Sequence, residues 1–316
     1  MSPQVEAVLF IFGLVAVGYL AGITGYLKAE AGDALAEFAV SVALPLLLFR
    51  TMQSADFHGA APWSLWGTYF ASVAVAWTLG HLVTTRVFGR DARAGVVGGV
   101  SASFSNTVLL GIPLVLGVFG QKGFEILALI VSVHLAVMMA ASIIIFAILD
   151  GSGEGGVQPL ALAKDFVAKL VRNPLLIGIA VGLTFRLAGL ELPALGVRFV
   201  DALAGIAGPL ALFSIGLSMR RYGISGNVRA GMALAGLKLL VMPAVTLALA
   251  LLFGLSPLAA QVAVITASLP TGVNAYLIAV QFGTGHAIST NAMMIATSSA
   301  VLTASFWLFV LQVVFG

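Results

Sequence analysis

The chain has 316 residues, of which 60% are hydrophobic and only 9% are charged, and its mean hydropathy is +1.11. A water-soluble domain does not carry so apolar a surface, so the composition excludes that class and predicts an all-α membrane protein with several spans. The formal charge of +3 singles out no partner, and we expect no nucleic-acid partner. The chain has no cysteine, which excludes a disulfide framework and a thiolate metal site.

Ten hydrophobic segments follow one another, each near or above the roughly 17–25 residues that a spanning helix needs. They cover residues 5–27, 33–53, 63–87, 94–119, 123–149, 173–189, 194–219, 228–253, 257–282 and 287–315. The polar interval 151–172 begins with glycine and serine and is predicted to be a cytoplasmic linker. It divides the chain into two five-helix parts, residues 1–150 and 173–316.

Lysine and arginine are unevenly distributed among the loops. Ten lie in one set of alternate loops: Lys28, Arg86, Arg90, Arg93, Lys164, Lys169, Arg172, Arg220, Arg221 and Arg229. Four lie in the opposite set: Arg50, Lys122, Arg186 and Arg198. Because cytoplasmic loops are enriched in these residues, we predict that the first set is cytoplasmic and that both termini face outward. The expected location is the plasma membrane, the inner membrane of a bacterial cell.

The fourth segment is interrupted by residues that a plain spanning helix avoids. Polar side chains lie at Ser101, Ser103, Ser105 and Asn106, and Gly111 and Pro113 follow. Proline lacks an N–H and crowds the carbonyl four residues earlier, so a break is predicted near Leu109. The ninth segment has a similar stretch, Ala267–Asn274, about 165 residues later. Paired interruptions in the two halves of a chain indicate a transporter's binding site.

The two halves match at a second place with nearly the same offset. Residues Ala43–Phe49 are similar to Ala207–Phe213, with a proline at the third position of each. An acid precedes each proline by eight residues, Glu37 and Asp201, and we predict that each lies in the first turn of its helix. Because five helices is an odd number, the second copy enters the membrane upside down. The sequence therefore predicts two inverted repeats.

The interruptions at 106–113 and 269–274 are predicted to meet near the middle of the membrane. The N-terminal ends of broken helices carry partial positive charge and unpaired N–H donors, which suit a carboxylate. The candidate substrate-binding residues are Ser105, Asn106, Thr107, Pro113, Pro270, Thr271 and Asn274. The alternative is that these residues only cap broken helices or pack against neighbouring helices.

Two further residues are candidates for a coupling or structural charge. Lys238 is the one basic residue deep within a segment, where a charge is costly. It points either toward carbonyls at the ends of broken helices, in place of a sodium ion, or toward the substrate. His134 is either a protonatable group or a hydrogen-bonded packing residue. We predict no metal site and no cofactor, and leave proton or sodium coupling open.

Enzyme signatures are missing from the sequence. Gly216-Leu217-Ser218 is a fragment of a nucleophile motif without a neighbouring histidine, and no glycine-rich phosphate loop is present. We therefore predict that the protein is not an enzyme and that transport is not driven directly by ATP. A uniporter, a symporter or an antiporter remains.

Three motifs resemble the auxin efflux carrier family, which includes plant auxin exporters and bacterial malonate carriers. They are Asn106-Thr-Val-Leu-Leu-Gly-Ile-Pro-Leu114, Leu269-Pro-Thr-Gly-Val-Asn-Ala-Tyr276 and Arg172-Asn173-Pro174. The short linker at 151–172 resembles that of bacterial members of the family. The resemblance implies ten helices in two inverted repeats, as in bile-acid sodium symporters and sodium/proton antiporters. Broken helices 4 and 9 would cross, with Asn106 and Pro113 on one and Pro270 on the other.

The resemblance also implies a division of labour. Helices 1, 2, 6 and 7 would form a scaffold that joins two copies into a homodimer, and helices 3–5 and 8–10 would form a transport domain. We expect a secondary transporter of small organic anions, such as malonate or auxin-like acids, working by elevator-type alternating access. The first alternative is a sodium-coupled symporter like the bile-acid carriers. The second is a sodium/proton antiporter or a channel.

Overall fold

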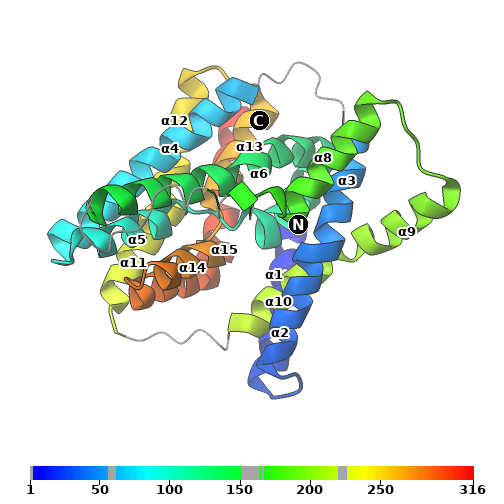
Figure 1. Ribbon diagram of the computed structural model, residues 1–316. Helices are drawn as coiled ribbons and strands as arrows, with labels where there is room; N and C mark the ends of the chain where they lie inside the picture. The colour runs from blue at the N-terminus through cyan, green and yellow to red at the C-terminus, as the bar shows by residue number, and fades with distance from the viewer. Residues whose placement is uncertain (1–2, 56–61, 151–163, 165–166, 169, 220–225) are drawn as a thin grey trace. The chain divides into compact units, whose positions relative to one another are not determined.

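A computed structural model describes the chain except for residues 1–2, 56–61, 151–163, 165–166, 169 and 220–225 (Figure 1). The described residues form helices, without a strand beyond one isolated bridge. Two sequence predictions fall wholly or partly outside this description. Most of the linker at 151–172 does so, as do Lys169, Arg220 and Arg221, which contributed to the predicted orientation.

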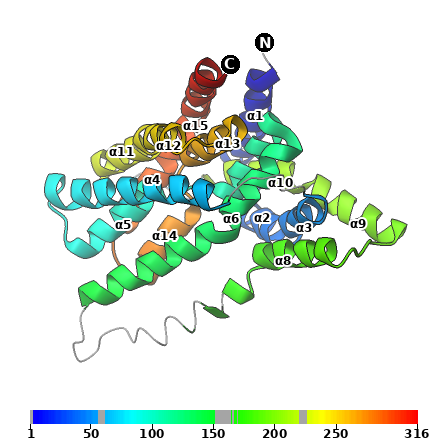
Figure 2. The ribbon, with the colours of Figure 1, turned by 90° about the horizontal axis from the view of Figure 1, so that it is seen from above.

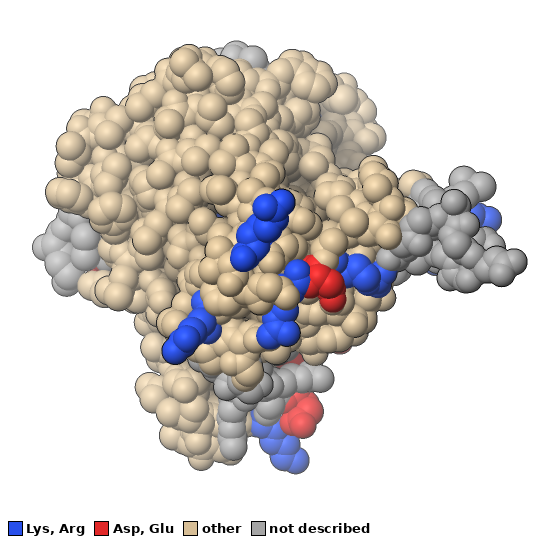
Figure 3. All heavy atoms as spheres, turned by 90° about the vertical axis from the view of Figure 1, so that its left-hand side faces the viewer, with Lys and Arg blue, Asp and Glu red and all other residues tan. Residues whose placement is uncertain are grey.

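The described helices identify a polytopic membrane protein. Six helical stretches are long and apolar enough to cross a membrane, namely 6–23, 30–54, 107–149, 194–218, 228–252 and 286–315. The stretch 107–149 contains Gly120 at φ 64°, which interrupts the helical backbone, and two further apolar helices are shorter than a span. The ten-span arrangement stays a prediction. Figure 3 shows one face on which charged side chains are sparse among the described residues.

The chain folds into two compact units that each use both halves of the sequence. Unit 1 comprises residues 1–60, 107–132 and 169–222, and unit 2 comprises residues 61–106, 133–168 and 223–316. Helix α6 (Ile112–Asp150) begins in unit 1 and ends in unit 2. The units therefore cut across the two predicted five-helix parts.

Unit 1 is built from two pairs of closely packed helices. Its remaining elements are α1 (Pro3–Ile23), α2 (Ala29–Phe38), η1 (Ala39–Ala43), α3 (Leu44–Ser54), η3 (Thr107–Gly111), α8 (Pro174–Leu187), α9 (Ala194–Gly205) and α10 (Ala207–Ser218). Helix α1 packs on α10, where a side chain at Gly216 would overlap the backbone of Val15. Helix α8 lies beside α3 in Figures 1 and 2. Small residues permit such close approach between membrane helices.

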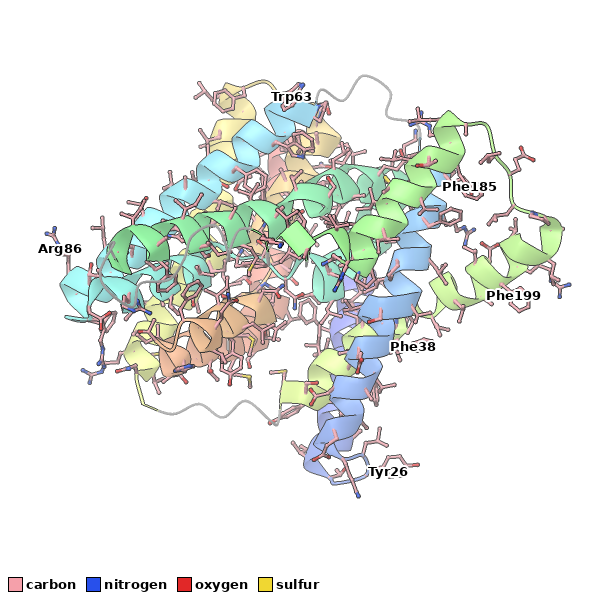
Figure 4. All side chains as sticks on the ribbon, in the orientation of Figure 1. Tyr26, Phe38, Trp63, Arg86, Phe185 and Phe199 are labelled. Carbon is pink, nitrogen blue, oxygen red and sulfur yellow. The ribbon has the colours of Figure 1, made fainter. Side chains whose placement is uncertain are left out.

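Aromatic contacts add to the second pair. The ring of Phe185 on α8 lies edge-on to that of Phe49 on α3, with the ring centres 5.3 Å apart (Figure 4). By contrast, Phe199 on α9 and Tyr26 in the turn between α1 and α2 are largely exposed (Figure 4). Large exposed apolar side chains are ordinary on a surface that faces lipid.

Unit 2 holds the helices that lead into the two interruptions. Its elements are α4 (Pro62–Leu82), η2 (Val83–Val87), α5 (Ala92–Ser103), α11 (Val228–Gly236), η5 (Leu237–Val241), α12 (Met242–Leu252), α13 (Pro257–Ser268), α14 (Val273–Gln281) and α15 (His286–Phe315). Helix α4 packs against α5 and α12. Residues 94–103 of α5 and 262–268 of α13 are all buried, so both helices lie in the interior of the unit. A helix that is apolar all round is typically buried in this way.

Wide π-helical turns precede three of the prolines. Each turn ends two residues before a proline: η1 before Pro45, η3 before Pro113 and η5 before Pro243. A proline in a helix lacks a donor and crowds the carbonyl four residues earlier, and a wider turn relieves that clash. For Pro243 that carbonyl belongs to Leu239, and it accepts a hydrogen bond from the indole of Trp307 at 2.8 Å. A side chain thus satisfies the acceptor that Pro243 leaves free.

The placement of two acids corrects the sequence analysis. Glu37 and Asp201 were predicted in the first turns of their helices. Glu37 instead lies near the end of α2, and Asp201 lies in the second half of α9. The carboxylate of Asp201 pairs with the guanidinium of Arg50 at 3.0 Å. Both side chains are substantially exposed, so this ion pair adds little stability.

Candidate functional site

Two helices of unit 2 stop abruptly in the buried interior. Helix α5 ends at Ser103, and the backbone is extended at Phe104. Helix α13 ends at Ser268, and the chain is extended at Leu269 and again at Gly272, before α14 begins at Val273. A helix that stops leaves backbone donors and acceptors without intrahelical partners, and these need other partners in a membrane.

The two extended segments satisfy each other. Ser105 and Thr271 form an antiparallel bridge. The backbone N–H of Asn106 donates to the carbonyl of Pro270, and that of Gly272 donates to the carbonyl of Phe104, both at 2.9 Å. Pro270 has no N–H, so it serves this pair only as an acceptor. The two interruptions are therefore one local structure.

Hydroxyl groups satisfy the carbonyls that the broken helices leave free. Thr271 Oγ1 donates to the carbonyl of Ser101 at 2.7 Å, across from one segment to the other. Ser268 Oγ donates within its own helix to the carbonyl of Ile265 at 2.9 Å. The hydroxyl of Tyr69 on α4 donates to Ser105 Oγ at 3.0 Å. Ser105 and Thr271 are thus buried members of the framework, which agrees with the capping alternative for these two residues.

The side chains of Asn106 and Asn274 differ from these buried serine and threonine side chains in exposure and in hydrogen bonding. Both are only partly buried. Within the part of the chain that the structure describes, neither side-chain amide has a hydrogen-bond partner. Asn274 lies in the first turn of α14, where backbone N–H groups point outward and the helix end is positive. Two accessible amides beside such a turn suit an anion that accepts several hydrogen bonds.

Lys238, in η5, is fully buried. Its ammonium group donates to the carbonyl of Ala267, in the last turn of α13. The C-terminal end of a helix carries partial negative charge, and an ammonium group there is favourable. The geometry matches the first of the two alternatives from the sequence, in which the lysine points toward carbonyls at a broken end.

His134, on the unit 2 part of α6, lies in an aromatic box next to the bridge. Its ring centre is 4.8 Å from that of Phe104, 5.7 Å from that of Tyr69 and 6.4 Å from that of Phe70. It is 1% exposed, and neither ring nitrogen has a hydrogen-bond partner among the described residues. Its role as a protonatable group or as a packing residue stays a prediction.

The structure brings seven of the nine candidate residues together in unit 2. They are Ser105, Asn106, Pro270, Thr271, Asn274, Lys238 and His134. The other two, Thr107 and Pro113, belong to unit 1. There Pro113 lines a cavity of about 850 Å³ together with Gly208 and Gln121. Among the described residues no cluster of three histidines or acids could hold a metal ion.

Sequence reasoning missed two residues that organise this region. Tyr69 holds Ser105 in place, and Phe104 forms one wall around His134. The only signal for Tyr69 was a phenol in the middle of an apolar segment, since a buried tyrosine usually finds a hydrogen-bond partner. No local pattern distinguishes Phe104 from the other phenylalanines of the chain.

Comparison with known proteins identifies the family. A family model described as membrane transport protein matches residues 3–308. The chain belongs to this family. It is the auxin efflux carrier family of membrane transporters, and neither the family nor the relatives described next are enzymes.

Several curated proteins are similar to the chain. An "Uncharacterized transporter" of Methanothermobacter thermautotrophicus is 25% identical over 97% of this chain and 98% of its own length. The "Putative malonate transporter" of Rhizobium meliloti is 26% identical over 99% of this chain and 97% of its own length. The "Probable auxin efflux carrier component 1d" of Oryza sativa subsp. japonica is 30% identical over 46% of this chain and 28% of its own length.

Proposed function

We propose that this member of the auxin efflux carrier family is a secondary transporter of small organic anions. The substrate would be a carboxylate such as malonate or an auxin-like acid, held at the paired interruptions of unit 2. The observation that carries the proposal is the pair of half-buried, unpartnered amides of Asn106 and Asn274 beside the start of α14. The names of two relatives, one for malonate and one for auxin, point to the same class of substrate.

The lengths of the helices support a binding site near the middle of the membrane. Helices α5 and α13 have 12 residues each. At about 1.5 Å per residue, 12 residues span about 18 Å, which is little more than half of a hydrocarbon core of about 30 Å. We therefore propose that the segments following α5 and α13 turn near the midplane as crossed broken helices, in the manner of inverted-repeat transporters.

Transport would proceed by alternating access of the elevator type. Unit 2 contains the candidate site and most of the helices expected for the transport domain. Unit 1 contains the helices expected for the scaffold and, in addition, residues 107–132, which the family resemblance assigns to the transport domain. We propose that unit 2 moves against unit 1 and carries the anion from one side of the membrane to the other. A homodimer joined through the scaffold helices completes this proposal.

The test of function measures uptake into liposomes that contain the purified, unaltered protein. We expect labelled malonate to enter vesicles that contain the protein, with the same rate in sodium and in potassium buffers, because Lys238 already provides a cation at the broken helix end. Indole-3-acetate in the same assay tests the auxin-like class. Uptake that requires sodium would replace the proposal with the sodium-coupled symporter. An ionic current without any carboxylate would replace it with a channel.

We also propose ten spans with both termini outside the cytoplasm, in the plasma membrane. Since the chain lacks cysteine, single cysteines report on topology without removing any native residue of that type. Tyr26 and Leu190 lie in exposed turns between helices. In intact cells, a membrane-impermeant maleimide is expected to label a Leu190→Cys variant and to leave a Tyr26→Cys variant unlabelled until the cells are opened. The reverse pattern would invert the proposed orientation.

A further inference from the structure

We propose that His134 binds a proton when a carboxylate binds, so that the anion and the proton cross the membrane together. This inference rests on the proposed function, because it assigns a coupling ion to the same site. The proton adds to the lone pair of one ring nitrogen on one side of the membrane and leaves on the other side. No other bond forms or breaks.

The burial of an unpartnered imidazole is the first observation. Buried polar groups in proteins are nearly always hydrogen-bonded, and an unpaired one costs about 1–3 kcal/mol. His134 is 1% exposed and has two unpartnered nitrogens. Thr271 and Ser268 at the bridge are hydrogen-bonded, and Ser101 Oγ is the other unpartnered polar side-chain atom among the described residues there. An imidazole kept in this state, next to the binding site, has a proton-binding atom that the framework does not use.

The surroundings of the ring are suited to a change of charge. Three aromatic rings lie near His134, those of Tyr69 and Phe104 in edge contact and that of Phe70 stacked at a longer distance, so its immediate surroundings are polarizable rings. The titratable groups that face it are Tyr69 from α4 and Lys238 from η5, and from the interruption its neighbours are Phe104 and the backbone of Ser105. A positive charge on Lys238 would oppose a second positive charge on His134.

The arrival of an anion reverses this balance. Among the described residues Lys238 is the only fully buried lysine or arginine. A dicarboxylate such as malonate brings two negative charges, of which Lys238 offsets one. A protonated His134 offsets the other, so the loaded site crosses the low-dielectric interior of the membrane without net charge. Because charge is costly there, the proton and a dicarboxylate favour each other's binding.

The experiment measures proton uptake by the purified protein in weakly buffered solution with a pH-indicator dye. On adding malonate above about pH 7, where both of its carboxyl groups are ionised, we expect uptake of about one proton per malonate bound. A His134→Gln variant is expected to bind malonate, measured by calorimetry, with no proton uptake. The control is His81→Gln, a second histidine of unit 2 that lies at the end of α4, and it should behave as the unaltered protein.

A second measurement does not depend on any variant. The malonate affinity of the unaltered protein is expected to fall about tenfold per pH unit as the pH rises above neutrality, since one bound proton is linked to each bound anion. Binding of malonate without proton uptake and without this pH dependence would overturn the role of His134 and leave the anion carrier standing. Proton uptake that survives in His134→Gln would do the same. A protein that binds no carboxylate would overturn both proposals together.

Discussion

Replacing Asn106 with alanine is expected to reduce carboxylate affinity about 10- to 150-fold, with a matching loss of transport at low substrate concentration. The amide is half-buried and has no partner among the described residues, so it is free to donate to an anion. A hydrogen bond to a charged group contributes about 1.5–3 kcal/mol, which corresponds to that range of affinities. Malonate affinity by calorimetry and initial uptake rates in liposomes measure the effect.

The fold of the Asn106→Ala variant should be intact, because the bridge uses the backbone N–H of residue 106 and not its side chain. The matched control is Asn173→Ala. The side chain of Asn173 accepts hydrogen bonds from Leu175 and Leu176 at the start of α8, so its removal should cost about 0.5–2 kcal/mol of stability and leave affinity unchanged. An Asn106→Ala protein with unaltered affinity and rate would remove the amide from the proposed site.

The sequence was sufficient to predict that two segments are interrupted but not what holds the interruptions together. The first interruption was predicted at residues 106–113, and the extended backbone lies at 104–106 instead, with helical turns from Thr107 onward. Proline, glycine and clustered hydroxyls signal a break because they act on the backbone of their own segment. Whether Ser105 faces Thr271 depends on how segments about 165 residues apart pack, and no local pattern encodes that register. The same limit explains why Tyr69 was missed: its partner is 36 residues away.

The hydroxyl groups show a second limit of sequence reasoning. The hydroxyl of a serine or threonine beside a break can donate a hydrogen bond either to a substrate or to a free backbone carbonyl, and the sequence does not distinguish the two. The structure separates the cases by burial and partner, since Thr271 donates to the carbonyl of Ser101 whereas Asn106 and Asn274 remain accessible. The first-turn placement predicted for Glu37 and Asp201 was wrong for two reasons. Hydropathy placed the start of the second segment at residue 33, whereas α2 already begins at Ala29. Helix α9 begins at Ala194, as hydropathy predicted, and Asp201 lies seven residues later, beyond the first turn.

Proline produced a distortion that the sequence analysis predicted only as a break. At Pro45 and Pro243 the helix widens into a π-turn and then continues, and at Pro113 a π-turn opens the helix that follows the extended backbone at 104–106. The outcome depends on whether something else satisfies the freed carbonyl, as Trp307 does for Leu239 from a helix distant in sequence. Lys238 lies within the last of these turns, so the distortion also affects where its side chain is directed.

Replacing Lys238 with methionine is expected to lower stability by about 1.5–3 kcal/mol and to abolish malonate transport. Methionine is similar in length and is apolar, so packing is largely kept while the charged donor is lost. The carbonyl of Ala267 would then face a buried interior without a partner, which is the main cost. The negative end of α13 would also lose the charge that balances it. Thermal unfolding in detergent, followed by uptake in liposomes, measures both effects.

The matched control is Lys122→Met, which removes an exposed lysine of unit 1 and should leave stability and transport unchanged. Sodium distinguishes the two roles that the sequence left open for Lys238. If the ammonium group takes the place of a cation at the broken helix end, sodium should raise the unfolding temperature of Lys238→Met and leave that of the unaltered protein unchanged. If Lys238 instead contacts the substrate, the variant will keep its stability and lose only carboxylate affinity. That second result would make Lys238 a binding residue and would remove the physical reason for expecting sodium-independent transport.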